Sequence, residues 1–390
     1  MTDPASLTQS AAETLERLIA FDTTSRRTNL ELIEFAEQRL TACGAKMRRV
    51  GNADGSKANL IASIGPEIDG GILLSGHTDV VPVDGQAWSS DPFALTLRDG
   101  RYYGRGTADM KAFLALALAA APDFAAGDLK RPVQLAFSYD EEIGCLGAPS
   151  LIRDLVRSGP RPSVVIVGEP TSMETVSGHK GIATFKVTVT GKEAHSSLTH
   201  LGVSAIMEAA KLIALLSQIA RELERGADPA SPFIPKGASL TIGQIKGGTA
   251  VNILARECVF AFDLRAPPGV DVRKVLQPLF DRAEQLDAEL KARAPEAGVR
   301  VETRSGTPPL RPDPEGEAEA LARRLAGDNG PARVVSYAAE AGQFQEAGYS
   351  TVICGPGSIE QAHQPDEYLE VSQLERGAAF MARLADHLAQ

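Results

Sequence analysis

The stretch GGILLSGHTDVVPVDGQ, from Gly70 to Gln86, decides the fold. It contains an apolar strand that ends at His77, and Asp79 follows two residues later. Successive strand side chains alternate between faces, so His77 and Asp79 project to the same side of the chain. Two interpretations are open. His77 is a packing histidine held by a nearby carboxylate, or it is a metal ligand whose ring Asp79 orients.

Length and composition describe a globular protein of two domains. The chain has 390 residues, which is more than one hydrophobic core usually supports. The hydrophobic fraction of 43% and the charged fraction of 23% are ordinary for a folded protein. The net charge is −10 and no basic stripe is interleaved with aromatic residues. We therefore expect no nucleic-acid partner, because a phosphate backbone would be repelled.

The sequence carries no sign of export or of a membrane. The polar segment TDPASLTQSAAETLERL after Met1 has no basic region leading into an apolar one, and no apolar run reaches about 18 residues. We expect a cytoplasmic protein without a membrane partner. Cys43, Cys145, Cys258 and Cys354 are far apart and form no CxxC pair, which favours reduced, buried thiols. Any metal would be held by histidine and carboxylate.

The first half of the chain alternates between expected helices and strands. Helices are expected over 11–21, 30–44, 108–125 and 147–159, and strands over 58–65, 70–76, 132–142 and 163–170. This order predicts an α/β fold with a mostly parallel central sheet flanked by helices. The same pattern returns after residue 308, with helices over 315–327 and 373–390 and a strand over 350–357.

The pattern between these parts is different. From Gly181 the segment 182–192, IATFKVTVTGK, alternates with a period of two, which suits a sheet with one solvated face. A helix over 203–225, strands over 238–248 and 257–266, a helix over 271–294 and a strand over 299–305 follow. This is the ferredoxin-like β-α-β-β-α-β order. We predict that residues 1–179 and 307–390 form one domain, interrupted by residues 180–306.

Acidic side chains and histidine recur where the expected strands stop, as in LLSGHTD, GRGTADMK, FSYDEEIG and VIVGEPT. Open α/β sheets bind ligands at that edge. Each residue alone has a simpler interpretation: Asp109 could cap a helix, and Glu141 with Glu142 could be a charged edge. Together with His363 in IEQAHQPDE, several carboxylates at one edge would be costly unless cations neutralised them.

A count of ligands favours two metal ions. His77, Asp109 and Glu169 would bind one ion, and Asp109, Glu142 and His363 the other, so that Asp109 bridges. Each ion then has three protein ligands and one position left for a shared hydroxide, as expected for catalytic zinc. Three carboxylates and one hydroxide would balance two Zn²⁺ ions. Sites of this kind also accept cobalt or manganese.

The ordered motifs GHTDVVP, GRGTADMKAFL, SYDEEIGCLGA, GEPTSM and EQAHQPDEYL resemble the M20 family of dinuclear zinc peptidases and deacylases over nearly the whole chain. The resemblance implies the same ligand set, with two divalent cations that are zinc or cobalt. It further implies that Glu141 is the general base and that Asp79 orients the metal site. It also implies that residues 180–306 form a lid through which the protein is a homodimer, and that residues 1–179 and 307–390 form the catalytic domain.

Residues outside the ligand set are assigned by resemblance and chemistry together. His195, in GKEAHSS, is typical of a surface turn on its own, whereas the resemblance implies that it reaches the reacting oxygen across the dimer. Asn252 and Arg265 are candidates for binding substrate, because the Arg fork matches a carboxylate. Arg265 could equally pair with Asp263. Glu340, in YAAEAGQF, is a candidate for attracting a substrate ammonium group.

The resemblance implies a hydrolase whose substrate is a small N-acyl amino acid. Other deacylases and metallo-carboxypeptidases share the metal ligands and remain alternatives within the enzyme class. From another class, a binding protein that kept the fold without catalysis is the remaining alternative. Such a protein should lack a ligand or the base, and this sequence retains Glu141, Glu142 and both histidines.

Overall fold

The chain divides into two compact units in a computed structural model that describes residues 3–390. One unit comprises the described residues up to Gly178 together with Leu310–Val334 and Ala339–Gln390, and the other comprises His179–Pro309 and Val335–Ala338. Within the first unit the chain leaves and returns at neighbouring points, because a Cβ added to Gly178 would lie 3.0 Å from Pro312 Cδ. The role of the second unit as a lid or dimerisation domain stays a prediction.

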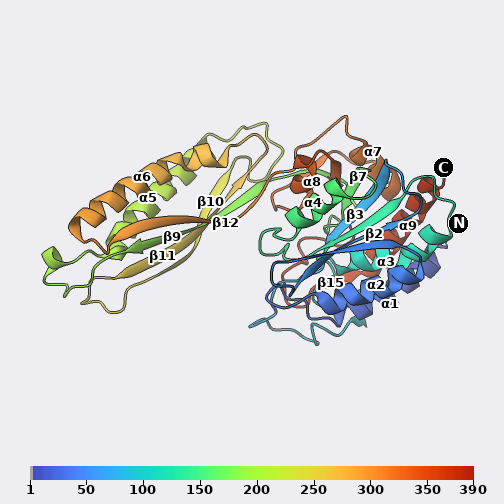
Figure 1. The fold of residues 1–390 in the computed structure, drawn as a ribbon, viewed down its shortest axis with the longest axis horizontal. Helices are drawn as coiled ribbons and strands as arrows, with labels where there is room; N and C mark the ends of the chain where they lie inside the picture. The colour runs from blue at the N-terminus through green and yellow to red at the C-terminus, as the bar shows by residue number, and fades with distance from the viewer. Residues whose placement is uncertain (1–2) are drawn as a thin grey trace. The chain divides into compact units, whose positions relative to one another are not determined.

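The first unit is built on an eight-stranded sheet with the order β1-β2-β6-β3-β7-β14-β8-β13 (Figure 1). The central strands β6, β3, β7 and β14 are parallel, whereas β2 runs antiparallel to both of its neighbours and β8 antiparallel to β14. The strands are β1 (Lys46–Gly51), β2 (Ala58–Ile64), β3 (Gly71–His77), β6 (Val133–Ser138), β7 (Pro162–Val167), β8 (Val176–His179), β13 (Arg333–Val335) and β14 (Ser350–Ile353). The predicted α/β fold with a mostly parallel central sheet is confirmed.

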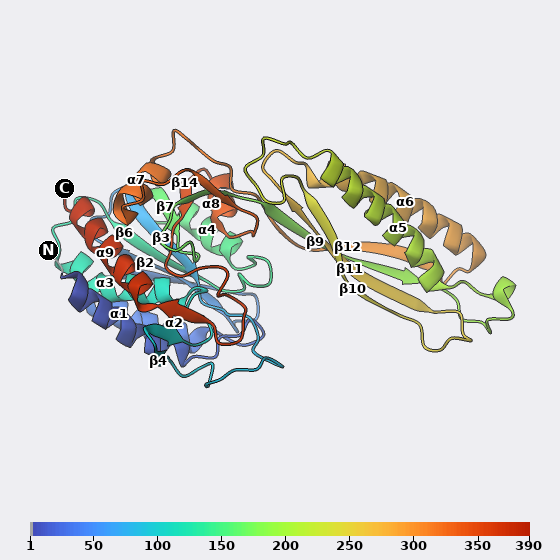
Figure 2. The same cartoon turned by 180° about the vertical axis from the view of Figure 1, so that it is seen from behind.

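Helices pack on both faces of this sheet (Figure 2). On one face, inward side chains such as Leu60 and Ala62 share a core with α1 (Pro4–Ile19), α2 (Leu30–Ala42), α3 (Lys111–Ala126), α7 (Glu317–Ala326) and α9 (Val371–Leu388). On the other face lie α4 (Ala148–Arg157) and α8 (Ala341–Glu346). Helix α3 is buried almost all round because its sequence is almost entirely apolar. Even so, no helix within residues 3–390 is long and apolar enough to cross a membrane.

A small three-stranded sheet brings two distant loops of the first unit together. Its order is β15-β5-β4, with β4 (Thr96–Arg98), β5 (Arg101–Tyr103) and β15 (Tyr368–Glu370). In the antiparallel register Tyr368 lies opposite Tyr103. The loop that follows β5 and the loop that precedes β15 are therefore neighbours, although more than half of the chain separates them.

The second unit is a four-stranded antiparallel sheet of order β10-β11-β9-β12 with two helices on it. Its elements are β9 (Gly181–Thr190), α5 (Ala205–Arg225), β10 (Ser239–Gly247), β11 (Glu257–Ala266), α6 (Val272–Arg293) and β12 (Gly298–Thr307), with a 3₁₀ turn at Thr199–Leu201. Figures 1 and 2 both show α5 and α6 side by side along one face. The observed chain order is the predicted β-α-β-β-α-β.

Candidate metal centre

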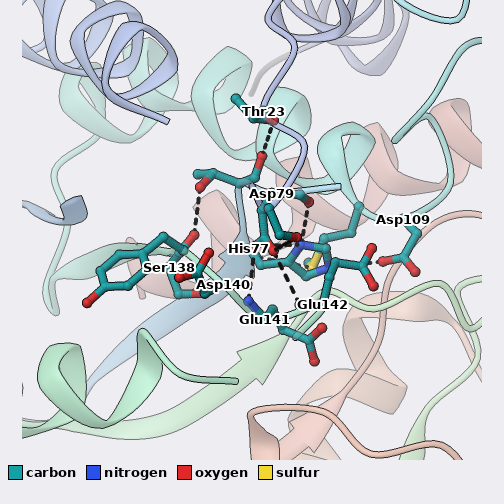
Figure 3. A network of polar contacts seen from close by, with 12 residues as sticks. Thr23, His77, Asp79, Asp109, Ser138, Asp140, Glu141 and Glu142 are labelled. Atoms are coloured by element: carbon teal, nitrogen blue, oxygen red, sulfur yellow. Dashed lines mark hydrogen bonds and ion pairs between the residues drawn. The ribbon is translucent and has the colours of Figure 1, made fainter. Parts of the chain in front are cut away.

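The predicted metal ligands lie at the carboxyl edge of the parallel strands. His77 is the last residue of β3, Glu142 follows β6 and Glu169 follows β7, while Asp109 lies just before α3 and His363 in the loop before β15. Parallel strands end at the same edge of a sheet, so residues that follow them meet there. Figure 3 shows His77, Asp109 and Glu142 gathered at this edge.

The distances place Asp109 between two histidines. His77 Nε2 lies 2.9 Å from Asp109 Oδ1 and 4.0 Å from Glu169 Oε1. His363 Nε2 lies 3.4 Å from Asp109 Oδ2 and 3.1 Å from Glu142 Oε2. Each oxygen of Asp109 therefore faces a different histidine, which is the arrangement of a carboxylate that bridges two ions.

The donor set fits cations. Oε1 of Glu142 and Oε1 of Glu169 are buried without a hydrogen-bond partner in the described part of the chain. Buried polar atoms are usually partnered, so these two oxygens are available to a ligand from outside the protein. Ligand atoms of two groups lie within 4.8 Å of one another: His77, Asp109 and Glu142, and His77, Glu141 and Glu169. Because Glu141 belongs to one of these groups, distance alone does not separate the expected base from the ligands.

The pKa values of two carboxyl groups and two histidines at this edge are raised. Burial raises the pKa of Glu141 to about 8 and that of Glu142 to about 7. Burial alone would lower the pKa of His77, but its hydrogen bond with Asp109 raises this pKa well above the usual value. Hydrogen bonds with Asp109 and Glu142 raise the pKa of His363 to about 10. Two bound cations would displace these protons.

Asp79 contacts His77 through its backbone and not through its carboxylate. His77 Nδ1 donates to the backbone oxygen of Asp79 at 2.9 Å, whereas the Asp79 carboxylate lies 3.7 Å from this nitrogen. The carboxylate accepts instead from the backbone N–H groups of Glu141 at 3.0 Å and Glu142 at 3.3 Å, and from Ser25 Oγ at 2.7 Å. Asp79 therefore holds the loop that carries Glu141 and Glu142. Sequence reasoning missed Ser25, because nothing in its local pattern links it to a residue 54 positions away.

The environment of Glu141 includes a thiol that the sequence did not single out. Cys145 Sγ donates to Glu141 Oε1 at 3.2 Å, within the same turn of chain. With its backbone N–H on Asp79 and one oxygen on Cys145, Glu141 is oriented at both ends. The motif EEIGC could have suggested this contact, since the two residues are four positions apart in a tight turn.

Glu340 lies beneath the site. It is 1% exposed, and its oxygens accept from Ser75 Oγ at 2.6 Å and from Ser138 Oγ at 2.8 Å. Burial raises the pKa of this carboxyl group. Attraction of a substrate ammonium group by Glu340 stays a prediction, and it would act through its charge, since both oxygens already accept hydrogen bonds. Glu340 joins the ends of β3 and β6.

The other predicted residues belong to the second unit. His195 is exposed, and its Nδ1 lies 2.8 Å from Ser197 Oγ. The backbone N–H of the next residue, Ser196, donates to the backbone oxygen of Asn252 at 2.9 Å. The structure thus brings the segments of His195 and Asn252 together. Arg265 Nε lies 3.3 Å from Asp263 Oδ2, which is the alternative pairing that the sequence left open.

Comparisons with known proteins agree on one family. The sequence model of the family described as Peptidase family M20/M25/M40 matches residues 73–387. An acetylornithine deacetylase of Myxococcus xanthus is 38% identical over 383 residues, 96% of each chain, and one of Pasteurella multocida (strain Pm70) is 35% identical over 92% of this chain and 91% of its own. The crystal structure of an M20 family metallo-carboxypeptidase from Sulfolobus solfataricus has a TM-score of 0.76 at 18% identity, covering 97% of this chain and 99% of its own. At that identity the likeness concerns the fold.

Proposed function

The chain belongs to peptidase family M20/M25/M40, whose members include its curated relatives, and we propose that it removes the acetyl group from N2-acetyl-L-ornithine, giving ornithine and acetate. It is a metal-dependent hydrolase. The observation that supports the chemistry best is Asp109, whose two oxygens face two histidines beside buried, unpartnered carboxylate oxygens. The choice of substrate rests on the deacetylases that are similar over nearly the whole chain.

We propose that His77, Asp109 and Glu169 hold one cation and that Asp109, Glu142 and His363 hold the other. Two such cations, which we propose to be zinc or cobalt, would polarise the amide carbonyl and lower the pKa of water when bound. Histidine and carboxylate donors suit both metals, so availability decides between them.

Glu141 is the proposed general base. Its carboxylate would take a proton from the attacking water and deliver it to the amine nitrogen as the C–N bond breaks, which is the two-step proton transfer that amide hydrolysis needs. Its contacts with Asp79 and Cys145 support this role, because a base must be held at a fixed distance from its proton.

We propose functional roles for three residues of the second unit. His195 would reach across the dimer and donate to the oxygen on which negative charge develops. Asn252 would take part in substrate recognition, and Arg265 would bind the substrate carboxylate. Arg265 would exchange its ion pair with Asp263 for that carboxylate. We also propose a cytoplasmic homodimer that serves arginine biosynthesis, where the thiols of Cys43, Cys258 and Cys354 would stay reduced.

The test is a panel of substrates with purified protein loaded with zinc or cobalt. Initial rates on N2-acetyl-L-ornithine, N-succinyl-diaminopimelate, other N-acetyl amino acids and a dipeptide would be measured with and without chelator. We expect chelator-sensitive turnover that is fastest on N2-acetyl-L-ornithine. A faster rate on another compound would move the substrate and keep the hydrolase. No turnover on any compound, with metal bound, would favour a binding protein.

A further inference from the structure

A buried carboxylate outside the ligand set holds the loop that carries Asp109. Glu367 is 1% exposed and lies four residues after His363. Its Oε1 accepts from the backbone N–H groups of Ala108 at 2.8 Å and Asp109 at 3.0 Å, and its Oε2 from that of Gly106 at 3.0 Å. Three hydrogen bonds to the short segment 106–109 fix the backbone from which the Asp109 side chain projects.

Arg105 completes the set of donors around this carboxylate. Its NH1 lies 2.7 Å from Glu367 Oε2, in an ion pair whose two side chains are each 1% exposed. Its NH2 donates to Gln86 Oε1 at 2.6 Å, and its guanidinium lies 5.0 Å from the centre of the Trp88 ring. A buried ion pair carries a cost in desolvation. Here NH1 and NH2 of Arg105 are hydrogen-bonded, whereas its Nε has no hydrogen-bond partner within residues 3–390.

Gln86 connects Arg105 to the backbone of His363. Its Nε2 donates to the backbone oxygen of His363 at 2.9 Å. The His363 side chain is 51% exposed and its backbone has a φ of +63°, a left-handed conformation that is unfavourable for a residue with a Cβ. Packing alone therefore does not position His363. Hydrogen bonds to its backbone and to the residues that follow it do.

We propose that Glu367, Arg105 and Gln86 form a clamp that sets the distance between the Asp109 carboxylate and the His363 imidazole. One end of the clamp holds the backbone of Asp109, and the other holds the backbone of His363. The ion bound by Asp109, Glu142 and His363 depends on that distance. The ion bound by His77, Asp109 and Glu169 depends on it less, because His77 is the last residue of β3 and Glu169 follows β7, both strands of the central sheet. The inference rests on the proposed two-metal site and is independent of the substrate.

The experiment titrates metal-stripped protein with Zn²⁺ and with Co²⁺, using calorimetry and the visible absorption of bound cobalt. The variant His363→Ala first identifies which of the two binding steps depends on His363. Glu367→Gln places an amide among four donors and disrupts the clamp at its centre. We expect it to weaken the His363-dependent step by about 10- to 100-fold, the usual effect of removing a group that orients a ligand. The cobalt spectrum of that site should change as its geometry loosens.

A second variant and a control separate the clamp from general damage. Gln86→Met removes the bond to His363 at a partly exposed position, so it should fold even if Glu367→Gln does not, and it should weaken the same step. Glu370→Gln is the matched control, since Glu370 lies three residues further on and its ion pair with Arg101 is 37–41% exposed. It should leave both steps within about threefold of the unaltered protein.

The outcomes are distinct. Unchanged affinity at the His363-dependent step in Gln86→Met and in folded Glu367→Gln, or an equal loss at both steps, would overturn the clamp. Failure of the unaltered protein to bind two ions would overturn the metal site itself. Slow turnover on N2-acetyl-L-ornithine with normal binding of both ions would concern only the proposed substrate.

Discussion

At the scale of single residues, the site is defined by which oxygen faces which partner. One carboxylate oxygen of Asp109 faces His77 and the other faces His363. Both carboxylate oxygens of Asp79 accept hydrogen bonds from the backbone of the loop that carries Glu141 and Glu142. Two carboxylates of the same type thus have different roles because of what surrounds them. The chemistry of the site follows from these partners more than from the residue types.

The role of Glu141 can be tested by removing its charge alone. Glu141→Gln keeps the size of the side chain but cannot accept a proton from water. We expect kcat to fall by about 10²- to 10⁴-fold, the usual contribution of a general base, while two metal ions stay bound. Steady-state rates and metal analysis of the same sample would check this. If Glu141→Gln loses one ion instead, Glu141 is a ligand, as its place in one of the close groups allows.

Sequence reasoning reaches the ligand residues but not the residues that hold them. His77, Asp109, Glu142, Glu169 and His363 stand in motifs at strand ends, where local pattern and ligand chemistry point to the same residues. Their supports are long-range: Ser25 contacts Asp79, and Glu367 contacts the loop before Asp109. No periodicity or spacing encodes such a contact. It exists only once the loops are folded against each other.

At the scale of elements, long apolar segments were predicted well and short polar ones were missed. The sheet strands β2, β3, β6, β7 and β14 have buried, apolar sequences. Two strands lack that apolar signal: β1, with the sequence KMRRVG, and β13, whose three residues are half-buried. Both are edge strands of the sheet. Their structure is imposed by a neighbour, which is a tertiary effect that propensity does not report.

The loop between α5 and β10 is held by one lysine, and this gives a pH-dependent prediction. Lys180 is buried, and its Nζ donates to the backbone oxygens of Pro235 at 2.6 Å and Gly237 at 2.7 Å. Lys180→Met removes both bonds, so we expect a loss of about 3 kcal/mol in the free energy of unfolding at neutral pH. Urea denaturation of both proteins would measure it.

The same lysine should make the difference depend on pH. Burial lowers the pKa of Lys180 below its usual 10.5. The unfolded chain therefore binds more protons than the folded one in the window just below 10.5, and stability from this residue rises as pH rises through that window. The advantage of the unaltered protein over Lys180→Met should grow from pH 8 to pH 10. A constant difference across these pH values would show that Lys180 has the same pKa in both states.

At the scale of the whole molecule, all proposed metal ligands come from one of the two units. Removing bound cations would leave the ligand oxygens of Glu142 and Glu169 without partners, and both residues belong to that unit. We expect chelation to lower the melting temperature of its unfolding transition, because each ion at a hundredfold excess over its Kd contributes about 2.7 kcal/mol. Scanning calorimetry with chelator, and after zinc is restored, would measure this shift.

A reference variant sharpens that measurement. His363→Ala should show a smaller shift, since it retains the ligands of one ion. Equal melting temperatures with and without saturating zinc in the unaltered protein would argue against a metal site built from these residues.

The close approach of Gly178 to Pro312 has a consequence for how such a chain could arise and be re-engineered. The inserted segment begins and ends at neighbouring points of the first unit. Its length or sequence can therefore be changed in the gene without changing the path of the chain in the first unit. Related proteins could then differ in this segment while the proposed metal ligands, which all belong to the first unit, stayed unchanged. Replacing the segment between Gly178 and Pro312 with a domain from another protein is therefore a starting point for redesign.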